Sequence, residues 1–260
     1  MRVGVLGLGE AGSLIAADLA RAGDEVRGYD PSEVPTPAGV ERQVRAEAAV
    51  TGCDLVLAMT PGSQARAALE GVLDALGEKA IYADLSTASP TLKEELAAVV
   101  AGHGALFADV ALMSPVPGRG LSAPALVSGS GATEFADLIN GRGGRVEVVG
   151  ARAGEAATRK LLRSVVVKGL AALLIESMEA AEQAGEGEWL WGHLIAELTS
   201  LDAAMLRRLR LDATPHAGRR LDEMKAAQDL LLGLGVTAHM TTATIEHLER
   251  ILNRGMPDQR

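Results

Sequence analysis

The stretch TRKLLRSVVVKG, from Thr158 to Gly169, contains side chains that can exchange protons. Lys160, Ser164 and Lys168 recur at helical spacing and predict a narrow polar stripe on an otherwise apolar helix. We expect this helix to be buried all round and to line a cleft between two domains. Burial lowers the pKa of a lysine, which suits it to proton transfer near neutral pH. The same spacing also fits lysines that reach water or pair with acids elsewhere.

A glycine motif at the start of the chain predicts dinucleotide binding. The sequence MRVGVLGLGEAG places an apolar strand directly before a G-x-G-x-x-G motif, and an amphipathic helix and a second strand follow. In this order, the tight turn and the first amides of the helix face a pyrophosphate. The residues predicted to bind the cofactor here are Gly7, Leu8, Gly9, Glu10, Ala11 and Gly12.

An acid at the end of the second strand bears on the choice of cofactor. Asp30 follows the glycine motif by about 20 residues, the usual distance for the residue that meets the adenosine ribose. A carboxylate there accepts hydrogen bonds from the ribose hydroxyls and repels a 2′-phosphate, so it favours NAD over NADP. Two alternatives stay open. The sequence DPS is also typical of a solvated turn, and Arg27 lies on the same strand and could clamp a 2′-phosphate.

Apolar strands and helical stretches alternate as far as Gly150. For residues 1–150 this alternation predicts an α/β fold of Rossmann type, with a doubly wound parallel sheet. Ligands bind such sheets at the carboxyl ends of the strands, where Thr60-Pro61 and Ser86-Thr87 are expected. The same residue types are also common in turns and helix caps. Ser89-Pro90 predicts the start of a helix.

Beyond Gly154 the strand signals end, so residues 151–260 are predicted to form an all-helical domain. Its first helix would be roughly 30 residues long, or about 45 Å. Shorter helices are expected at about 189–200, 201–211, 217–232 and 237–253. The long helix and the run LLLGLGV offer more aliphatic surface than so small a domain can bury, which favours a homodimer.

The composition narrows the class of protein. The 260 residues carry a formal net charge of -9, which disfavours nucleic acid and anionic membranes as partners and leaves a small-molecule substrate as the expectation. No apolar run is long enough to span a membrane. The histidines and acids show no metal-ligand spacing, so no metal is expected. A single cysteine, Cys53, and the absence of a signal peptide predict a cytoplasmic protein.

Four motifs together resemble the β-hydroxyacid dehydrogenases, which include 3-hydroxyisobutyrate and 6-phosphogluconate dehydrogenases. They are the glycine motif, DLSTASP at 84–90, FADVALMSPVPG at 107–118 and GEAATRKLLRS at 154–164. The resemblance covers essentially the whole chain and is closest to a shorter branch with a compact C-terminal domain. It implies an NAD(P)-dependent oxidoreductase that acts on a small, anionic hydroxyacid or a related carbonyl compound.

The resemblance also implies roles for single residues. Lys160 would be the catalytic general acid or base, and Ser164 would contact the substrate hydroxyl. Those expected to bind the cofactor, besides the glycine motif and Asp30, are Thr60, Pro61, Thr87 and Lys225. Those expected to meet the substrate are Ser86, Met113, Ser114, Lys168 and His216.

Two departures from the family pattern bear on the substrate. Met113-Ser114-Pro115 replaces the carboxylate-binding S-G-G, and a proline removes an amide donor. Val167 stands where the sugar-acid enzymes have an acid, so 6-phosphogluconate is not the expected substrate. Two other functions stay open: imine reduction, whose enzymes commonly lack the lysine, and dinucleotide sensing without turnover.

Overall fold

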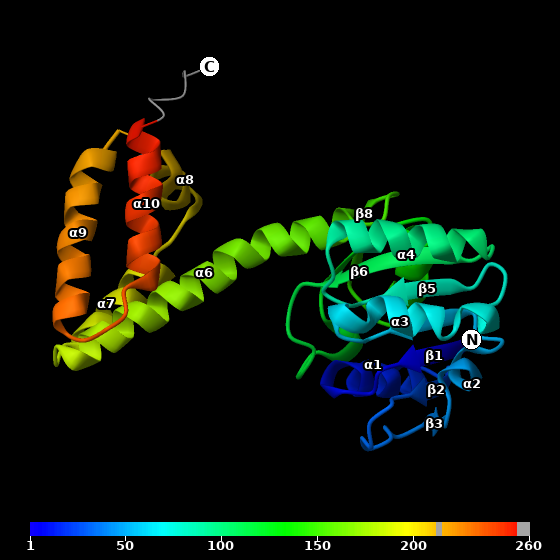
Figure 1. The fold of residues 1–260 in the computed structure, drawn as a ribbon. Coiled ribbons are helices and arrows are strands. Elements are labelled where there is room, and N and C mark those ends of the chain that lie inside the picture. The colour runs from blue at the N-terminus through cyan, green and yellow to red at the C-terminus, as the bar shows by residue number, and fades with distance from the viewer. Residues whose placement is uncertain (212–214, 254–260) are drawn as a thin grey trace. The chain divides into compact units, whose positions relative to one another are not determined.

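The computed structural model describes residues 1–211 and 215–253 and divides the chain into two compact units. The first unit, Met1–Arg163, contains a sheet covered by helices, and the second, Ser164–Arg260, is helical (Figure 1). The predicted succession of an α/β domain and a helical domain is therefore confirmed.

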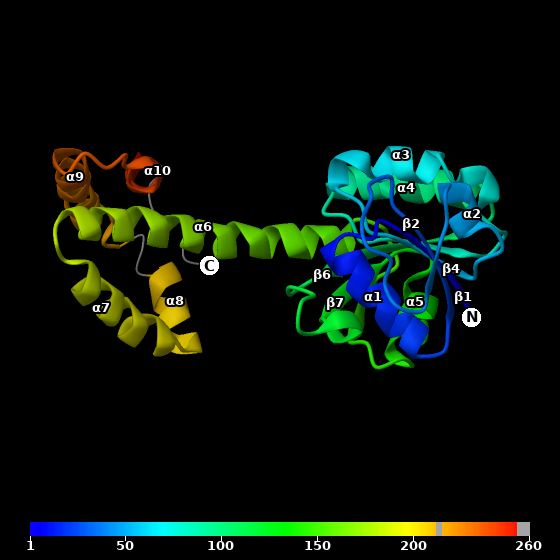
Figure 2. The same cartoon turned by 90° about the horizontal axis from the view of Figure 1, so that it is seen from below.

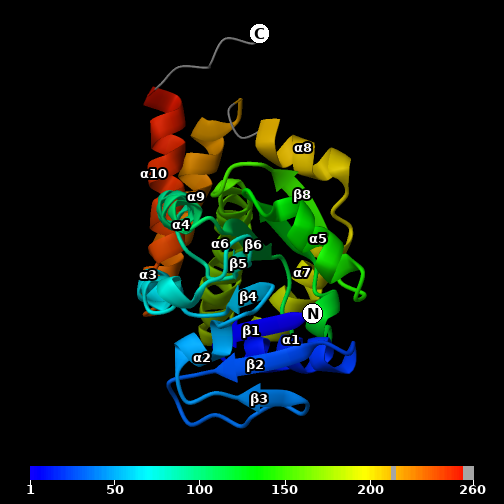
Figure 3. The same cartoon turned by 90° about the vertical axis from the view of Figure 1, so that its right-hand side faces the viewer.

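Eight strands form one sheet in the order β3-β2-β1-β4-β5-β6-β7-β8, of which β3 to β6 can be followed in Figure 3. Their bounds are β1 (Arg2–Leu6), β2 (Glu25–Tyr29), β3 (Val40–Arg42), β4 (Leu55–Ala58), β5 (Ile81–Asp84), β6 (Leu106–Leu112), β7 (Ala125–Ser128) and β8 (Val146–Gly150). The apolar runs of β4 and β5 are buried throughout, as expected for central strands covered on both faces. The alternation of strands and helices predicted for residues 1–150 is present, and only the short β3 was not predicted as a strand.

Helices cover both faces of the sheet (Figure 2). On one face, α1 (Glu10–Arg21) and α5 (Ala132–Asn140) pack with the sheet into one apolar cluster. On the other face, α2 (Ala46–Val50), α3 (Ala65–Glu70) and α4 (Pro90–Gly102) form a second cluster. Three 3₁₀ turns complete the unit: η1 (Gly62–Gln64), η2 (Leu73–Ala75) and η3 (Gly120–Ser122).

The predicted start of α4 is confirmed. Ser89 is the N-cap residue, and its hydroxyl accepts a hydrogen bond of 3.2 Å from the amide of Leu92. Pro90 is the first helical residue, where its missing N–H costs no intrahelical bond.

The prediction of a parallel sheet throughout is wrong at one pair of strands. β7 runs antiparallel to β6, whereas β8 is parallel to β7. A parallel crossover requires a long connection, usually an α-helix, and residues 113–124 contain three prolines and only the short η3. The first half of β6 pairs with β5 and its second half with β7. Asp109 lies opposite Ser128 of β7, and Ser128 lies opposite Gly150, so β8 ends at the level of Asp109.

In its described residues, the second unit contains most of α6 (Glu155–Gln183) and four further helices. These are α7 (Gly187–Thr199), α8 (Ala203–Leu211), α9 (Ala217–Gly233) and α10 (His239–Asn253), in agreement with the predicted ranges to within a few residues. α9 and α10 lie side by side as an antiparallel pair (Figure 1). None of the described helices is long and apolar enough to cross a membrane.

A buried carboxylate fixes α10 to α6 within this unit. Glu176 accepts hydrogen bonds from the amides of Met240 and Thr241, at 2.7 and 2.9 Å, and from the Thr241 hydroxyl at 2.7 Å. Burial would raise the pKa of Glu176, but these hydrogen bonds outweigh burial and lower it. The carboxylate therefore satisfies amides at the start of α10 that have no partner within their own helix.

The expectation of a long helix buried all round is wrong for the single chain. No residue of α6 between Thr158 and Ile175 is buried, and Val165 and Val166 are 73% and 68% exposed. An apolar sequence identifies side chains that avoid water, but it does not tell whether the same chain or another covers them. Lys168 is accordingly exposed.

Candidate functional site

The loops that carry the predicted cofactor residues leave the sheet at one level. Strand pairing aligns Tyr29 with Leu6, Leu6 with Ala58, and Ala58 with Asp84. These are the last residues of β2, β1, β4 and β5. The glycine motif, Asp30, Thr60-Pro61 and Ser86-Thr87 therefore follow at the same carboxyl edge, where sheets of this kind bind ligands.

The glycine turn between β1 and α1 requires its glycines. Gly7 has a φ of 98°, and a Cβ there would lie 2.6 Å from the carbonyl oxygen of Met59. A Cβ on Gly12 would overlap the carbonyl oxygen of Gly7, so only glycine lets α1 pack so closely on the turn. Gly9 is the N-cap residue of α1, and a Cβ there would meet nothing within 4 Å. Its backbone is open to an approaching ligand.

A cavity of about 650 Å³ adjoins this turn, within the usual size range of small-molecule sites. Five of the predicted cofactor residues line it: Gly7, Gly9, Asp30, Thr60 and Pro61. The Thr60 hydroxyl is buried and has no hydrogen-bond partner among the described residues. A buried hydroxyl of this kind costs free energy unless a ligand or water satisfies it. The open backbone and this hydroxyl fit a bound dinucleotide.

Asp30 and Arg42 fix the shape of the turn after β2. The Asp30 carboxylate accepts hydrogen bonds from the amides of Leu8, at 2.8 Å, and Ser32, at 2.9 Å. Arg42 donates to the carbonyl oxygens of Asp30, Ser32 and Val34, at 2.8 to 2.9 Å. Arg27 is engaged differently, because its guanidinium pairs with Glu25 at 2.8 Å and with Glu41 at 3.6 Å.

The loops after β4 and β5 touch each other. A Cβ on Gly62 would lie 2.5 Å from the carbonyl oxygen of Thr87, so the backbones of the two loops are in contact. Ser86 is 5% exposed, and its hydroxyl and amide both donate to the carboxylate of Asp84, at 3.1 and 2.9 Å. Thr87 is exposed. Of this predicted pair, only Thr87 therefore presents its side chain to solvent.

The start of α6 is bound to the sheet beside these loops. The amides of Gly154 and Ala157 both donate to Asp109 Oδ2, at 3.0 Å each. The Ala156 amide donates to the hydroxyl of Ser128, at 3.0 Å. These contacts lie within the first unit, which includes Lys160 at the following turn of α6. Lys160 is half-buried.

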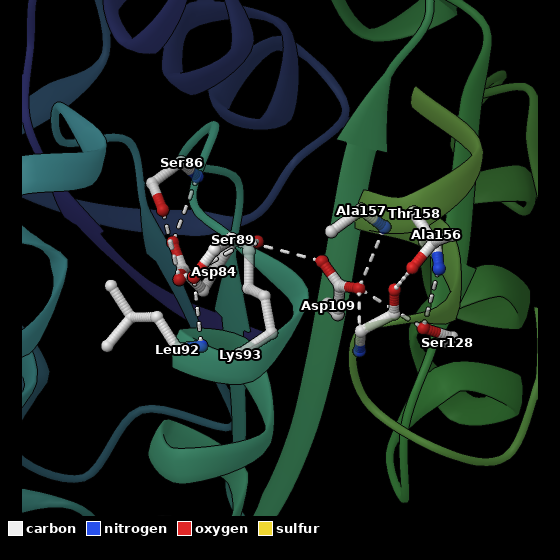
Figure 4. Close-up of polar contacts among 11 residues, drawn as sticks. Asp84, Ser86, Ser89, Leu92, Lys93, Asp109, Ser128, Ala156, Ala157 and Thr158 are labelled. Carbon is white, nitrogen blue, oxygen red and sulfur yellow. Dashed lines mark hydrogen bonds and ion pairs between the residues drawn. The ribbon is translucent and has the colours of Figure 1, made fainter. Parts of the chain in front are cut away.

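A buried lysine to which the sequence motifs assign no role lies at the centre of this region (Figure 4). Lys93 is fully buried on α4, and its ammonium lies 3.3 Å from Asp84 Oδ2 and 3.2 Å from Asp109 Oδ1. One sequence signal could have found it: Lys93, Leu96 and Val100 share the buried face of α4. A lysine on such a face needs an anionic partner.

The two predicted substrate residues after β6 lie elsewhere in the first unit. Met113 borders a separate hollow of about 460 Å³ with residues of β7 and β8. The Ser114 hydroxyl donates to the carbonyl oxygen of Pro115, at 3.2 Å. Neither residue lines the cavity at the glycine turn.

The remaining predicted residues belong to the second unit. Ser164 is half-buried on α6, and Lys168 is exposed on the same helix. Lys225 on α9 pairs with Glu249 on α10, at 3.3 Å. His216 is exposed and precedes α9 as its N-cap residue. In the described parts of the chain, no group of three or more histidine, cysteine or acidic residues is placed to hold a metal.

Two protein domains match this sequence. Residues 2–123 match the NAD binding domain of 6-phosphogluconate dehydrogenase, and residues 181–251 match a domain of unknown function, DUF1932. A probable 3-hydroxyisobutyrate dehydrogenase of Mycobacterium bovis is 30% identical over 193 residues. That alignment covers 70% of this chain and 65% of the relative, so the chain spans just under two thirds of that protein.

Solved structures resemble the whole chain. One is a conserved protein of unknown function described as structurally similar to 3-hydroxyacid dehydrogenases; it is 29% identical, with a TM-score of 0.61 and 97% of each chain covered. Another is a reductive aminase from Aspergillus terreus in complex with NADPH and ethyl-5-oxohexanoate. It is 19% identical, with a TM-score of 0.78, and the match covers 98% of this chain and 94% of the aminase. At that identity the likeness concerns the fold alone.

Proposed function

Because this chain belongs to the β-hydroxyacid dehydrogenase family, we propose that it catalyses hydride transfer between a nicotinamide cofactor and a small anionic hydroxyacid or related carbonyl compound. Lys160 is the proton-transfer group of this proposal. The cofactor occupies the cavity beside the glycine turn, with its adenosine ribose at Asp30.

The observation that carries the proposal is the common edge of the sheet. The glycine turn, the loop of Thr60 and the loop of Thr87 all leave the strands at one level. Asp109 lies opposite Asp84 in the register of β5 and β6. Its carboxylate also binds the first turn of α6, the helix that bears Lys160. A cofactor-binding cavity and an amine thus belong to the same compact unit.

The chemistry assigned to Lys160 is the transfer of one proton. In oxidation, the neutral Nζ takes the proton of the substrate hydroxyl while the carbon–oxygen single bond becomes a carbonyl. In reduction, the ammonium returns this proton to the oxygen. A bound nicotinamide supplies the other half of the reaction, by accepting or donating a hydride at the same carbon.

We further propose that NAD is preferred over NADP. The Asp30 carboxylate is held at the cavity by two backbone amides, where it would repel a 2′-phosphate. Arg27, the alternative clamp for that phosphate, is already paired with Glu25 and Glu41. Arg42, the other cation at this turn, is occupied by the carbonyl oxygens of Asp30, Ser32 and Val34.

One screen tests the activity and separates it from the alternatives. Purified protein is mixed with a panel of small hydroxyacids and NAD or NADP, and absorbance of the reduced nicotinamide is followed. A parallel panel of carbonyl compounds with the reduced cofactors is run with and without an added amine. Turnover of a hydroxyacid supports the proposal. Turnover only when the amine is present would instead identify an imine reductase, and cofactor binding without any turnover would identify a sensor.

For the assembly, we propose a homodimer in which a second copy covers the apolar helices of the second unit. Among the described residues of this unit, the buried apolar cluster consists of Ala180, Leu231, Val236 and Ala238. Neither α7 nor α8 has a buried residue, and Trp189 and Trp191 are 64% and 53% exposed. Interfaces of obligate dimers resemble a domain core cut in half, which fits helices with this much exposed apolar surface.

The dimer predicts the mass in solution. Light scattering at micromolar concentration should give twice the 26.9 kDa of one chain. The monomer mass at this concentration would contradict the proposal, because an apolar surface of this size would then remain in water.

A cytoplasmic location completes the proposal. Cys53 is buried, its thiol lies 3.2 Å from the carbonyl oxygen of Ala49, and burial raises its pKa. The thiol is therefore protonated and shielded at neutral pH. A lone reduced cysteine of this kind is typical of proteins in reducing compartments.

A further inference from the structure

Lys93 is a lysine whose burial needs a reason. Its side chain is 0% exposed, and its ammonium lies between the carboxylates of Asp84 and Asp109 (Figure 4). A buried ion pair often stabilises a protein no better than an apolar group of the same volume. Tyr82, Leu96 and Phe107 provide an apolar core on this face of the sheet. Lys93 is therefore better explained by what its two partners hold.

One partner holds the start of α6. Asp109 Oδ2 accepts hydrogen bonds from the amides of Gly154 and Ala157, and also from the Ser128 hydroxyl at 3.2 Å. The positive end of the helix dipole adds to these contacts. Asp109 Oδ1 is buried and accepts no hydrogen bond from any described residue, so the ammonium of Lys93, 3.2 Å away, is what compensates its charge.

The other partner holds the loop after β5. Asp84 accepts both hydrogen bonds of Ser86, the residue before Thr87. Lys93 Nζ also donates to the carbonyl oxygen of Asp84, at 2.8 Å. The ammonium of Lys93 thus contacts both the backbone and the carboxylate of Asp84, where this loop starts. It also contacts the carboxylate of Asp109, which anchors α6.

The charges of the cluster make Lys93 the common element. Two carboxylates face one ammonium, and Asp84 and Asp109 are neighbours in the register of β5 and β6. Without the ammonium, two buried like charges would repel each other. The loop of Thr87 and the first turn of α6 would then no longer be connected through a common ion pair.

We propose that Lys93 is a positioning residue for the reaction: through Asp84 and Asp109 it sets the loop of Thr87 and the α6 turn of Lys160 relative to each other. This inference rests on the proposed function for the role of Lys160. The anchoring of α6 does not depend on that role and can be measured separately. A displacement of about 1 Å at a reacting group can reduce turnover a hundredfold.

The test compares Lys93→Met with the wild-type chain by hydrogen–deuterium exchange and kinetics. We expect exchange of peptides spanning residues 150–161 to accelerate at least about tenfold, while peptides from α9 and α10 stay unchanged. With the substrate that the screen identifies, kcat should fall about ten- to a hundredfold, while KM and the Kd for NADH stay within about threefold. Unchanged exchange in residues 150–161 would overturn the proposal, as would a loss confined to KM.

A second variant covers the case in which Lys93→Met does not fold. Asp109→Asn leaves Lys93 paired one to one with Asp84 and alters only the carboxylate that faces α6. Asp109→Asn should accelerate the exchange of the same peptides and lower kcat in the same way. Exchange at the wild-type rate would refute the anchoring. If Lys160→Ala turns over normally while Lys93→Met still accelerates exchange in residues 150–161, the proposed function fails and the anchoring stands.

Arg66→Met is the matched control. Arg66 on α3 forms an exposed ion pair with Glu95 on α4, so its loss removes a cation that pairs with the helix of Lys93. Exposed pairs contribute little to stability. Exchange in residues 150–161 and turnover should both stay at wild-type values. If Arg66→Met accelerates exchange as much as Lys93→Met does, the effect comes from a general loosening of α4, and the specific role of Lys93 is refuted.

Discussion

Lys160→Ala should lower kcat by about 10²–10⁴, the usual contribution of a general acid or base, while the Kd for the nicotinamide cofactor stays nearly unchanged. The loss is expected in kcat because Lys160 acts on the substrate oxygen during the reaction. The cavity at the glycine turn is lined by other residues, so cofactor binding should persist. Steady-state kinetics and a fluorescence titration with NADH measure the two quantities on the same preparation.

Lys168→Ala provides the comparison on the same helix. Lys168 lies two turns further along α6 and is exposed, so its replacement should change stability by no more than about 0.5 kcal/mol. Any effect on the reaction should appear mainly in KM. The assignment fails if the Lys160 variant turns over normally while the Lys168 variant is inactive.

Most of the fold could be predicted because its signals are local. The strands β1 and β4 to β7 are largely apolar runs bounded by turn residues, whereas β2 and β8 mix apolar and charged residues. The Ser89-Pro90 pair fixes the start of α4. β3 and α2 were missed because three and five residues are too few to show a period. The direction of β7 was wrong because strand polarity depends on the connection after β6, which has no helix to carry a crossover.

The candidate site also contains residues that local sequence predicts and residues that it does not. The glycine motif and Asp30 could be recognised because the turn, the helix start and the acid follow one another in the chain. Lys93 could not be assigned a role from sequence, because its partners lie on two other strands and only the register of β5 and β6 makes them neighbours. Its signal was weak, since one lysine on an apolar face can also extend to water.

The burial of α6 was mispredicted for a physical reason that also supports the proposed dimer. The helix is apolar over most of its length, yet Leu162, Val165 and Ile175 are exposed in the single chain. Apolar periodicity reports the area that must leave water, whichever chain covers it. A sequence therefore predicts how much apolar surface must leave water better than it predicts which chain covers that surface.

Cofactor preference gives the second large effect, and Asp30→Asn tests it with the least disturbance. Asparagine keeps an oxygen that can accept from the Leu8 amide, so the glycine turn retains its support. It removes the charge that should repel a 2′-phosphate. We expect the wild-type chain to bind NADH at least about tenfold more tightly than NADPH, which corresponds to about 1.4 kcal/mol. In Asp30→Asn this difference should shrink mainly through tighter binding of NADPH.

Arg27→Gln distinguishes the two ways of reading the adenosine ribose. If Asp30 decides the preference, this variant should leave both affinities within about twofold, because Arg27 is held by Glu25 and Glu41. If Arg27 turns to clamp a 2′-phosphate, its loss should weaken NADPH alone, by about tenfold or more for a charge-assisted contact. A wild-type preference for NADPH that disappears in Arg27→Gln would assign the choice of cofactor to Arg27 and not to Asp30.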